Sequence, residues 1–80
     1  MALVALNVRR ARKPNMAGKN YSTTTEFAVD DSAIKLATPS VCKKDTVSDG
    51  LVNAKVTIDI GGEVQYLWVT ETVTNILALS

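Results

Sequence analysis

The sequence has no histidine and only one cysteine, Cys42, among its 80 residues. A lone cysteine cannot form a disulfide within the chain, and one thiolate without histidine cannot complete a tetrahedral zinc site. Histidine is also the commonest general base in enzymes. We therefore expect no catalytic residue, no metal site and no cofactor, and we do not expect an enzyme. No sequence pattern indicates a small-molecule ligand either.

Long hydrophobic runs are also missing. The N-terminal run at residues 2–6 is far too short to span a bilayer. The arginines follow this run, whereas the positive charges of a signal peptide precede its apolar part. The sequence therefore predicts no membrane span and no secretion signal, and the unpaired cysteine favours a reducing compartment, either the cytoplasm or a virion.

A chain of 80 residues is long enough for one domain, 1–80. A domain of this size buries only roughly 60% of its unfolded surface, so its stability is marginal unless a partner chain helps. The composition leaves two ways to stabilise the domain: an efficient small core, or burial against another subunit.

The strongest structural pattern lies at residues 52–60, where apolar and polar side chains alternate. A period of two is typical of a strand with one buried face. Gly61-Gly62 follows as a hairpin turn, and residues 63–70 form the expected return strand. Weaker alternation at 21–29 adds a strand, and residues 2–8 fit either a strand or a helix. Residues 41–47 fit a strand or an extended loop before a turn at 48–50, and residues 71–79 fit either strand or short helix. The predicted fold is all-β: a small antiparallel sheet, sandwich or barrel of four to six strands with a C-terminal hairpin.

The register of this hairpin is open between two alternatives. A two-residue Gly61-Gly62 loop places Lys55 opposite Trp68, as turn chemistry favours. A loop one residue longer places Val56 opposite Trp68 and collects the large apolar groups on one face. We favour the longer loop because of this burial.

Residues 64–69 are apolar on both faces in either register, and such strands are usually covered on both sides. An 80-residue chain has little material for a second cover, so we expect copies of the chain to meet here. The predicted oligomer interface consists of Tyr66, Leu67, Trp68 and Val69.

Positive charge is concentrated in the first 20 residues, which contain five basic residues and no acidic one. In a loop or arm at 9–19, these cations could contact nucleic-acid phosphates, an acidic protein surface or only solvent. The candidate nucleic-acid-binding residues are Arg9, Arg10, Arg12, Lys13 and Lys19. Tyr21, Tyr66 and Trp68 are the available stacking platforms if a sheet face binds bases, although we expect these rings in the core.

The Thr- and Val-rich strands at 21–29 and 52–60, the histidine-free body and the basic stretch at 9–13 resemble small coat or decoration proteins of phages and other viruses. This resemblance implies self-association through strand edges and a basic surface that faces a genome. We expect a self-assembling structural subunit, most simply of a virion. The alternatives are a small nucleic-acid-binding β-domain and an adaptor or inhibitor that binds a protein by strand addition.

Overall fold

The structure is a computed structural model that describes residues 3–40 and 52–79. The strand or loop expected at 41–47, the turn expected at 48–50 and Cys42 lie outside the described residues. The elements in chain order are β1 (Leu3–Arg12), β2 (Lys19–Asp30), a 3-10 turn (Asp31–Ala33), β3 (Ile34–Pro39), β4 (Ala54–Ile60), β5 (Glu63–Val69) and the helix α1 (Val73–Leu79). The all-β prediction is confirmed.

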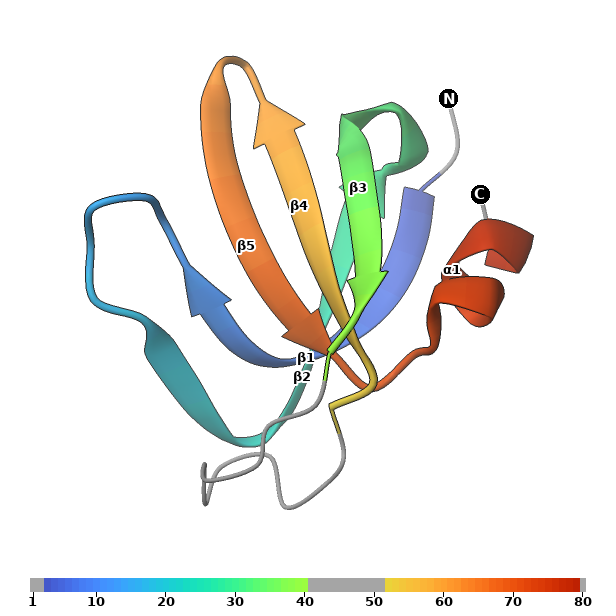
Figure 1. Cartoon of the computed structure of the whole chain (residues 1–80), viewed down its shortest axis with the longest axis horizontal. Helices are drawn as coiled ribbons and strands as arrows, with labels where there is room; N and C mark the ends of the chain where they lie inside the picture. The colour runs from blue at the N-terminus through green and yellow to red at the C-terminus, as the bar shows by residue number, and fades with distance from the viewer. Residues whose placement is uncertain (1–2, 41–51, 80) are drawn as a thin grey trace.

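All five strands belong to one antiparallel sheet with the order β2-β1-β5-β4-β3. Three pairings join strands that follow each other in the sequence, and the fourth joins β1 to β5. Figure 1 shows that the sheet curves: one half of β1 and β2 passes behind the other strands, whereas the half next to the β1–β2 turn lies to the left of β5. The β1–β5 pairing therefore brings the basic N-terminal segment beside the C-terminal hairpin.

The hydrophobic core fills the inside of this curved sheet. Alternate residues of the strands point inward, as a half-buried strand requires. The buried cluster contains residues of four strands and the helix: Val4, Leu6, Val8, Ala11, Val29, Ala54, Val56, Ile58, Leu67, Val69 and Ile76. The apolar half of the alternation at 52–60 thus forms the centre of the core.

The β4–β5 hairpin has the two-residue loop, so the longer loop that burial favoured is wrong. Ile60 pairs with Glu63, and Lys55 pairs with Trp68. Gly61 and Gly62 have φ angles of 60° and 89°. A two-residue turn with two positive φ angles matches the strand twist, and glycine adopts these angles without strain.

The C-terminal tail is a helix, which decides between the two structures that 71–79 allowed. Ile76 of α1 is buried in the core. The carboxylate of Glu71 holds the segment before the helix against β1. It accepts hydrogen bonds from the Asn7 backbone N–H at 2.9 Å and from the Asn7 side-chain Nδ2 at 2.6 Å. This double contact fixes where α1 covers the open side of the sheet.

Candidate nucleic-acid interface

The two faces of β5 have different environments. Leu67 and Val69 are completely buried in the core, whereas Tyr66 and Trp68 are half-buried on the opposite face. The two rings therefore lie outside the hydrophobic core, contrary to the expectation from their residue type. Because they alternate with the core residues of β5, they lie next to each other on the outer side of the sheet.

Basic residues of both neighbouring strands share this outer face. Trp68 is paired with Arg10 of β1 on one side and with Lys55 of β4 on the other. Tyr66 is paired with Arg12 of β1. Side chains that are directly opposite in an antiparallel pair point to the same face. We call this surface, made of Arg10, Arg12, Lys55, Tyr66 and Trp68, the basic–aromatic face.

The cations contact the rings directly. The Nζ of Lys55 lies 4.6 Å from the ring centroid of Tyr66 and 5.3 Å from that of Trp68. The Cζ of Arg10 lies 5.4 Å from the Trp68 centroid. These distances are typical of cation–π contacts. The outer face of β5 therefore carries two aromatic rings with positive charge held above them.

Two local features of the backbone produce this arrangement. The two-residue glycine turn sets the β4–β5 register and thereby places Lys55 opposite Trp68. An irregularity between Val8 and Arg10 shifts the register of β1 against β5, so that Arg10 pairs with Trp68 directly. A one-residue slip in a strand exchanges its faces, so each feature is required for the cations to meet the rings.

An acidic side chain also lies on this side of β4, at the turn end. Asp59 is paired with Val64, and its Oδ1 accepts a hydrogen bond from the Gly62 N–H at 3.0 Å. The carboxylate is thus engaged in closing the hairpin turn, away from the pairing positions of Trp68.

The five basic residues singled out in the sequence do not form one site. Arg10 and Arg12 belong to the basic–aromatic face. Arg9 is only 7% exposed, and its Nη1 donates to the Thr24 hydroxyl at 3.4 Å. Arg9 is therefore part of the packing between β1 and β2 rather than a surface cation.

Lys13 and Lys19 lie on either side of the β1–β2 turn. The Nζ of Lys13 is 3.7 Å from the Glu63 carboxylate, and the Nζ of Lys19 is 5.3 Å from the ring centroid of Tyr21. Residues 9–12 and 19 of the basic segment thus belong to strands, and the connection between β1 and β2 spans residues 13–18. Sequence reasoning missed Lys55, although its polar position in the alternation at 52–60 marks it as a residue of the outer face.

The expected oligomer interface is divided between the two faces of β5. Leu67 and Val69 are covered by the chain's own core, so a second molecule would meet Tyr66 and Trp68 instead. β5 is apolar on both faces, as its sequence indicates, but Lys55 and Arg10 of the same chain cover part of its outer face.

Within residues 3–40 and 52–79, no group of three or more His, Cys, Asp or Glu side chains is arranged to hold a metal ion. Among the same residues, no helix has the length and apolar character needed to cross a membrane. Comparisons with protein families, curated proteins and solved structures found no match.

Proposed function

We propose that this chain is a small nucleic-acid-binding β-domain that binds single-stranded nucleic acid on its basic–aromatic face. The observation that supports this proposal is a cluster on one outer face, in which Lys55 lies within 5.3 Å of the Tyr66 and Trp68 ring centroids and Arg10 lies 5.4 Å from that of Trp68. Unpaired bases stack on aromatic rings. Lys55 and Arg10 lie over the two rings in the free chain, so in the proposed complex the bases take their place on the rings and the two cations move to the phosphates of the same strand.

The expected energetics follow from these two kinds of contact. Stacking of a base on an aromatic side chain contributes about 1–3 kcal/mol, which corresponds to roughly a 5- to 150-fold change in affinity. Each phosphate neutralised on a single strand contributes about −0.7 to the slope of log K against log salt concentration. Three cations, Arg10, Arg12 and Lys55, therefore predict a slope of about −2.

The test is fluorescence anisotropy of a labelled single-stranded oligonucleotide, titrated with protein over a range of KCl concentrations. We expect binding that weakens with salt, and Arg10→Gln and Lys55→Gln should each reduce the slope by about 0.7. Lys35→Gln is the matched control, because Lys35 is an exposed cation on the β3 edge strand. Absence of wild-type binding at low salt, or equal effects of all three variants, would contradict the proposal.

The aromatic contribution needs its own variant. Trp68→Leu retains an apolar side chain but removes the stacking surface, and we expect the affinity to fall roughly 5- to 150-fold. Thermal unfolding of each variant shows whether the fold is retained. An unchanged affinity in a folded Trp68→Leu variant would exclude stacking at this position.

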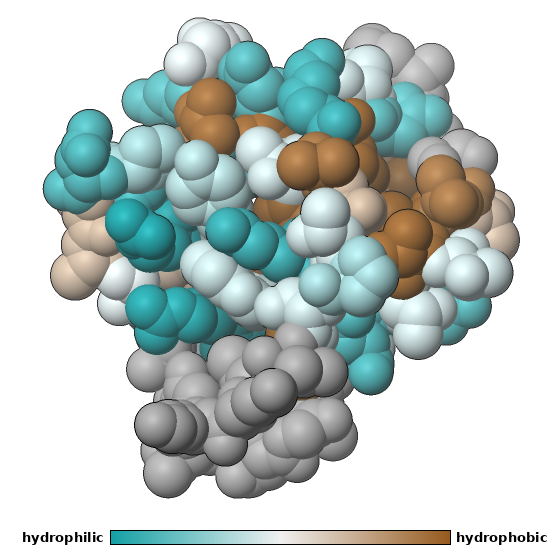
Figure 2. Space-filling model, in the orientation of Figure 1, coloured by the Kyte–Doolittle hydropathy of each residue, from teal (hydrophilic) through white to brown (hydrophobic). Residues whose placement is uncertain are grey.

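A second candidate function is a self-assembling structural subunit, most simply of a virion. An apolar groove of about 340 Å³ lies between β3 and α1, lined in part by Leu36, Val73 and Leu77. Leu36 and Leu77 are 56% and 68% exposed, and Figure 2 shows hydrophobic residues gathered over the helix. β3 is also an edge strand, and an edge strand can pair with another chain.

The occupant proposed for this groove is a second copy of the chain. Asp31 and Lys35 both line the groove, so a two-fold arrangement can bring each charge to its opposite on the other copy. Light scattering after size exclusion should show a uniform oligomer that Leu77→Glu dissociates. Leu3→Glu, at an exposed leucine outside the groove, should leave the mass unchanged. A monomer at micromolar concentration would contradict this candidate.

A further inference from the structure

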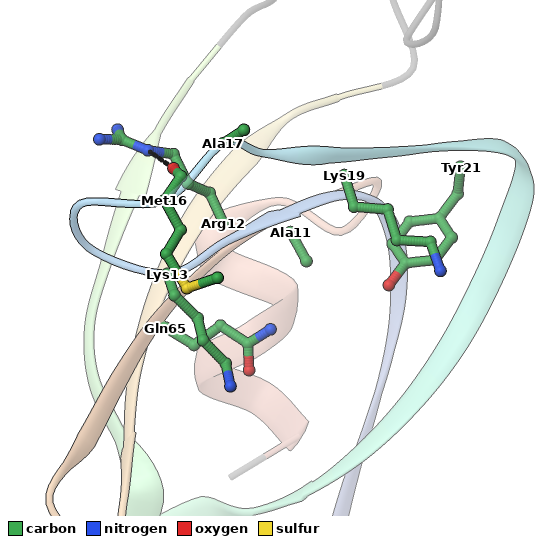
Figure 3. Close-up of a pocket in the computed structure, with 8 residues that line it drawn as sticks. All are labelled: Ala11, Arg12, Lys13, Met16, Ala17, Lys19, Tyr21 and Gln65. Carbon is green, nitrogen blue, oxygen red and sulfur yellow. Dashed lines mark hydrogen bonds between the residues drawn. The ribbon is translucent and has the colours of Figure 1, made fainter.

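A small pocket lies at the end of the sheet, where the β1–β2 turn approaches β5. Its volume is about 210 Å³, and it is lined by Ala11, Met16, Tyr21 and Gln65 together with basic residues of the turn. Figure 3 shows Met16 and Gln65 on one side and Tyr21 with Lys19 on the other, with Ala11 between them. Typical small-molecule sites measure about 300–1,000 Å³, so this pocket suits one planar ring rather than a larger ligand.

The walls of the pocket are held in place by neighbouring contacts. The Tyr21 ring packs edge to face against Phe27, with 5.8 Å between the centroids. On the other side, the Nε of Arg12 donates to the Met16 carbonyl oxygen at 3.2 Å, and the Met16 N–H donates to the Lys13 carbonyl oxygen at 3.2 Å. The Tyr21 ring and the backbone at Met16 are therefore held by the chain itself, which lowers the entropic cost of binding at these two walls.

Gln65 provides hydrogen-bonding capacity inside this mainly apolar pocket. Its amide has an NH₂ donor group and a carbonyl acceptor side by side. The side chain is half-buried, and no hydrogen bond joins it to any residue that the structure describes. Adjacent donors and acceptors are also what the edges of nucleobases present. The amide thus complements a base edge better than it complements a plain aromatic ring.

The charge around the pocket indicates a ligand with phosphates. Lys13, Lys19 and Arg12 are all lining residues, and Figure 3 shows the Arg12 guanidinium directed away from Gln65 and Tyr21. Arg12 is also the cross-strand partner of Tyr66, so it belongs to both the pocket and the basic–aromatic face. Ala11 and Gln65 lie on the inner side of the sheet, because Ala11 pairs with the core residue Leu67 and Gln65 is two positions from Leu67 on β5. A strand bound on the basic–aromatic face therefore reaches the pocket by turning around the end of β1 at Arg12.

We propose that this pocket takes up one unstacked nucleobase of the single strand, with the Tyr21 ring beside the base and the Gln65 amide on its edge. This inference rests on the proposed function, since the basic–aromatic face supplies the remaining affinity. Arg12 and Lys19 hold the adjacent phosphates, whereas Lys13 is paired with Glu63. The added contact of Lys19 raises the expected salt slope from about −2 to about −2.8. Binding then depends on the presence of a base at one position of the strand, whereas stacking on Tyr66 and Trp68 tolerates any base.

The experiment compares an intact oligonucleotide with a series in which one position at a time lacks its base. For the wild-type protein, we expect one abasic position to weaken binding more than its neighbours do. Gln65→Ala should weaken binding of the intact oligonucleotide roughly 2- to 12-fold, the value of one hydrogen bond. The same variant should bind the oligonucleotide with that abasic position as the wild type does. Thr23→Ala, at an exposed position of β2 outside the pocket, is the control.

The outcomes separate this inference from the proposed function. If the oligonucleotide binds and Trp68→Leu weakens it, but Gln65→Ala behaves like Thr23→Ala, the base pocket is wrong and the basic–aromatic face stands. If a nucleoside monophosphate binds as tightly as the oligonucleotide, the pocket is a site for a free nucleotide and the inference is also overturned. If no oligonucleotide binds at low salt, both proposals fail.

Discussion

Replacement of Glu71 by alanine tests how the C-terminal helix is attached to the sheet. The Glu71 carboxylate accepts two hydrogen bonds from Asn7, at 2.9 and 2.6 Å, in a half-buried position. A hydrogen bond to a charged group stabilises a protein by about 1.5–3 kcal/mol. Water partly replaces both bonds after the substitution, so we expect Glu71→Ala to lower the free energy of unfolding by about 2–3 kcal/mol.

Glu63→Ala is the matched control for this prediction. Glu63 faces Lys13 at 3.7 Å, with side chains that are 77% and 50% exposed, respectively. Exposed ion pairs of this kind contribute no more than about 1 kcal/mol. Glu71→Gln should fall between the two alanine variants, because its amide oxygen can accept one of the two bonds while its NH₂ group faces a donor.

The assay is urea unfolding followed by circular dichroism, with thermal unfolding as a second measurement. In a domain of this size, a loss of 2–3 kcal/mol lowers Tm by on the order of 10–20 °C. If the slope of the unfolding free energy against urea concentration is unchanged, the substitution has changed the stability and not the surface exposed on unfolding. A loss for Glu71→Ala no larger than that for Glu63→Ala would refute the structural role of the Asn7 contact.

Three other predictions concern the core, the turn and acid stability. Leu67→Ala should cost about 2–5 kcal/mol in urea unfolding, because Leu67 is fully buried, while Leu79→Ala at a half-exposed helix position should cost less than about 1 kcal/mol. Gly62→Ala should cost about 1–2 kcal/mol by the same assay, since φ is 89° there. The Ser32 backbone N–H and hydroxyl donate hydrogen bonds to Asp30 and lower its pKa. The stability that these bonds add is present above the ordinary Asp pKa of 3.8 and is lost as the pH falls through the lowered pKa. Asp30→Asn should flatten that loss in thermal unfolding between pH 2 and pH 5, and a curve that parallels the wild type would contradict this assignment.

The strands and the hairpin could be predicted from local patterns in the sequence. Alternation at 52–60 predicts β4 and its buried face, because each apolar residue there is two positions from the next. The glycine pair predicts the turn. The register preference was wrong because it treated Trp68 as a residue that requires an apolar cross-strand partner. A cation–π contact between Lys55 and the Trp68 ring takes the place of that apolar partner.

The candidate site depends on a contact that no local pattern contains. Arg10 meets Trp68 only through the pairing of β1 with β5, which joins residues 58 positions apart, and through the register shift after Val8. Without that shift, Arg10 would lie on the opposite face, because neighbouring residues of a strand alternate. Charge counting therefore identified the basic segment but not which of its side chains reach the surface, and it overlooked Lys55.

Trp68 is the only tryptophan of the chain, so its fluorescence reports directly on the basic–aromatic face. The most direct measurement of the central claim is a titration of the protein with unlabelled single-stranded oligonucleotide, followed by tryptophan emission at low salt. We predict strong quenching that saturates and that added KCl reverses, because a base stacks on the ring beside cations. Unchanged emission at oligonucleotide concentrations that saturate binding in anisotropy would contradict the claim, since the strand would then lie elsewhere on the molecule.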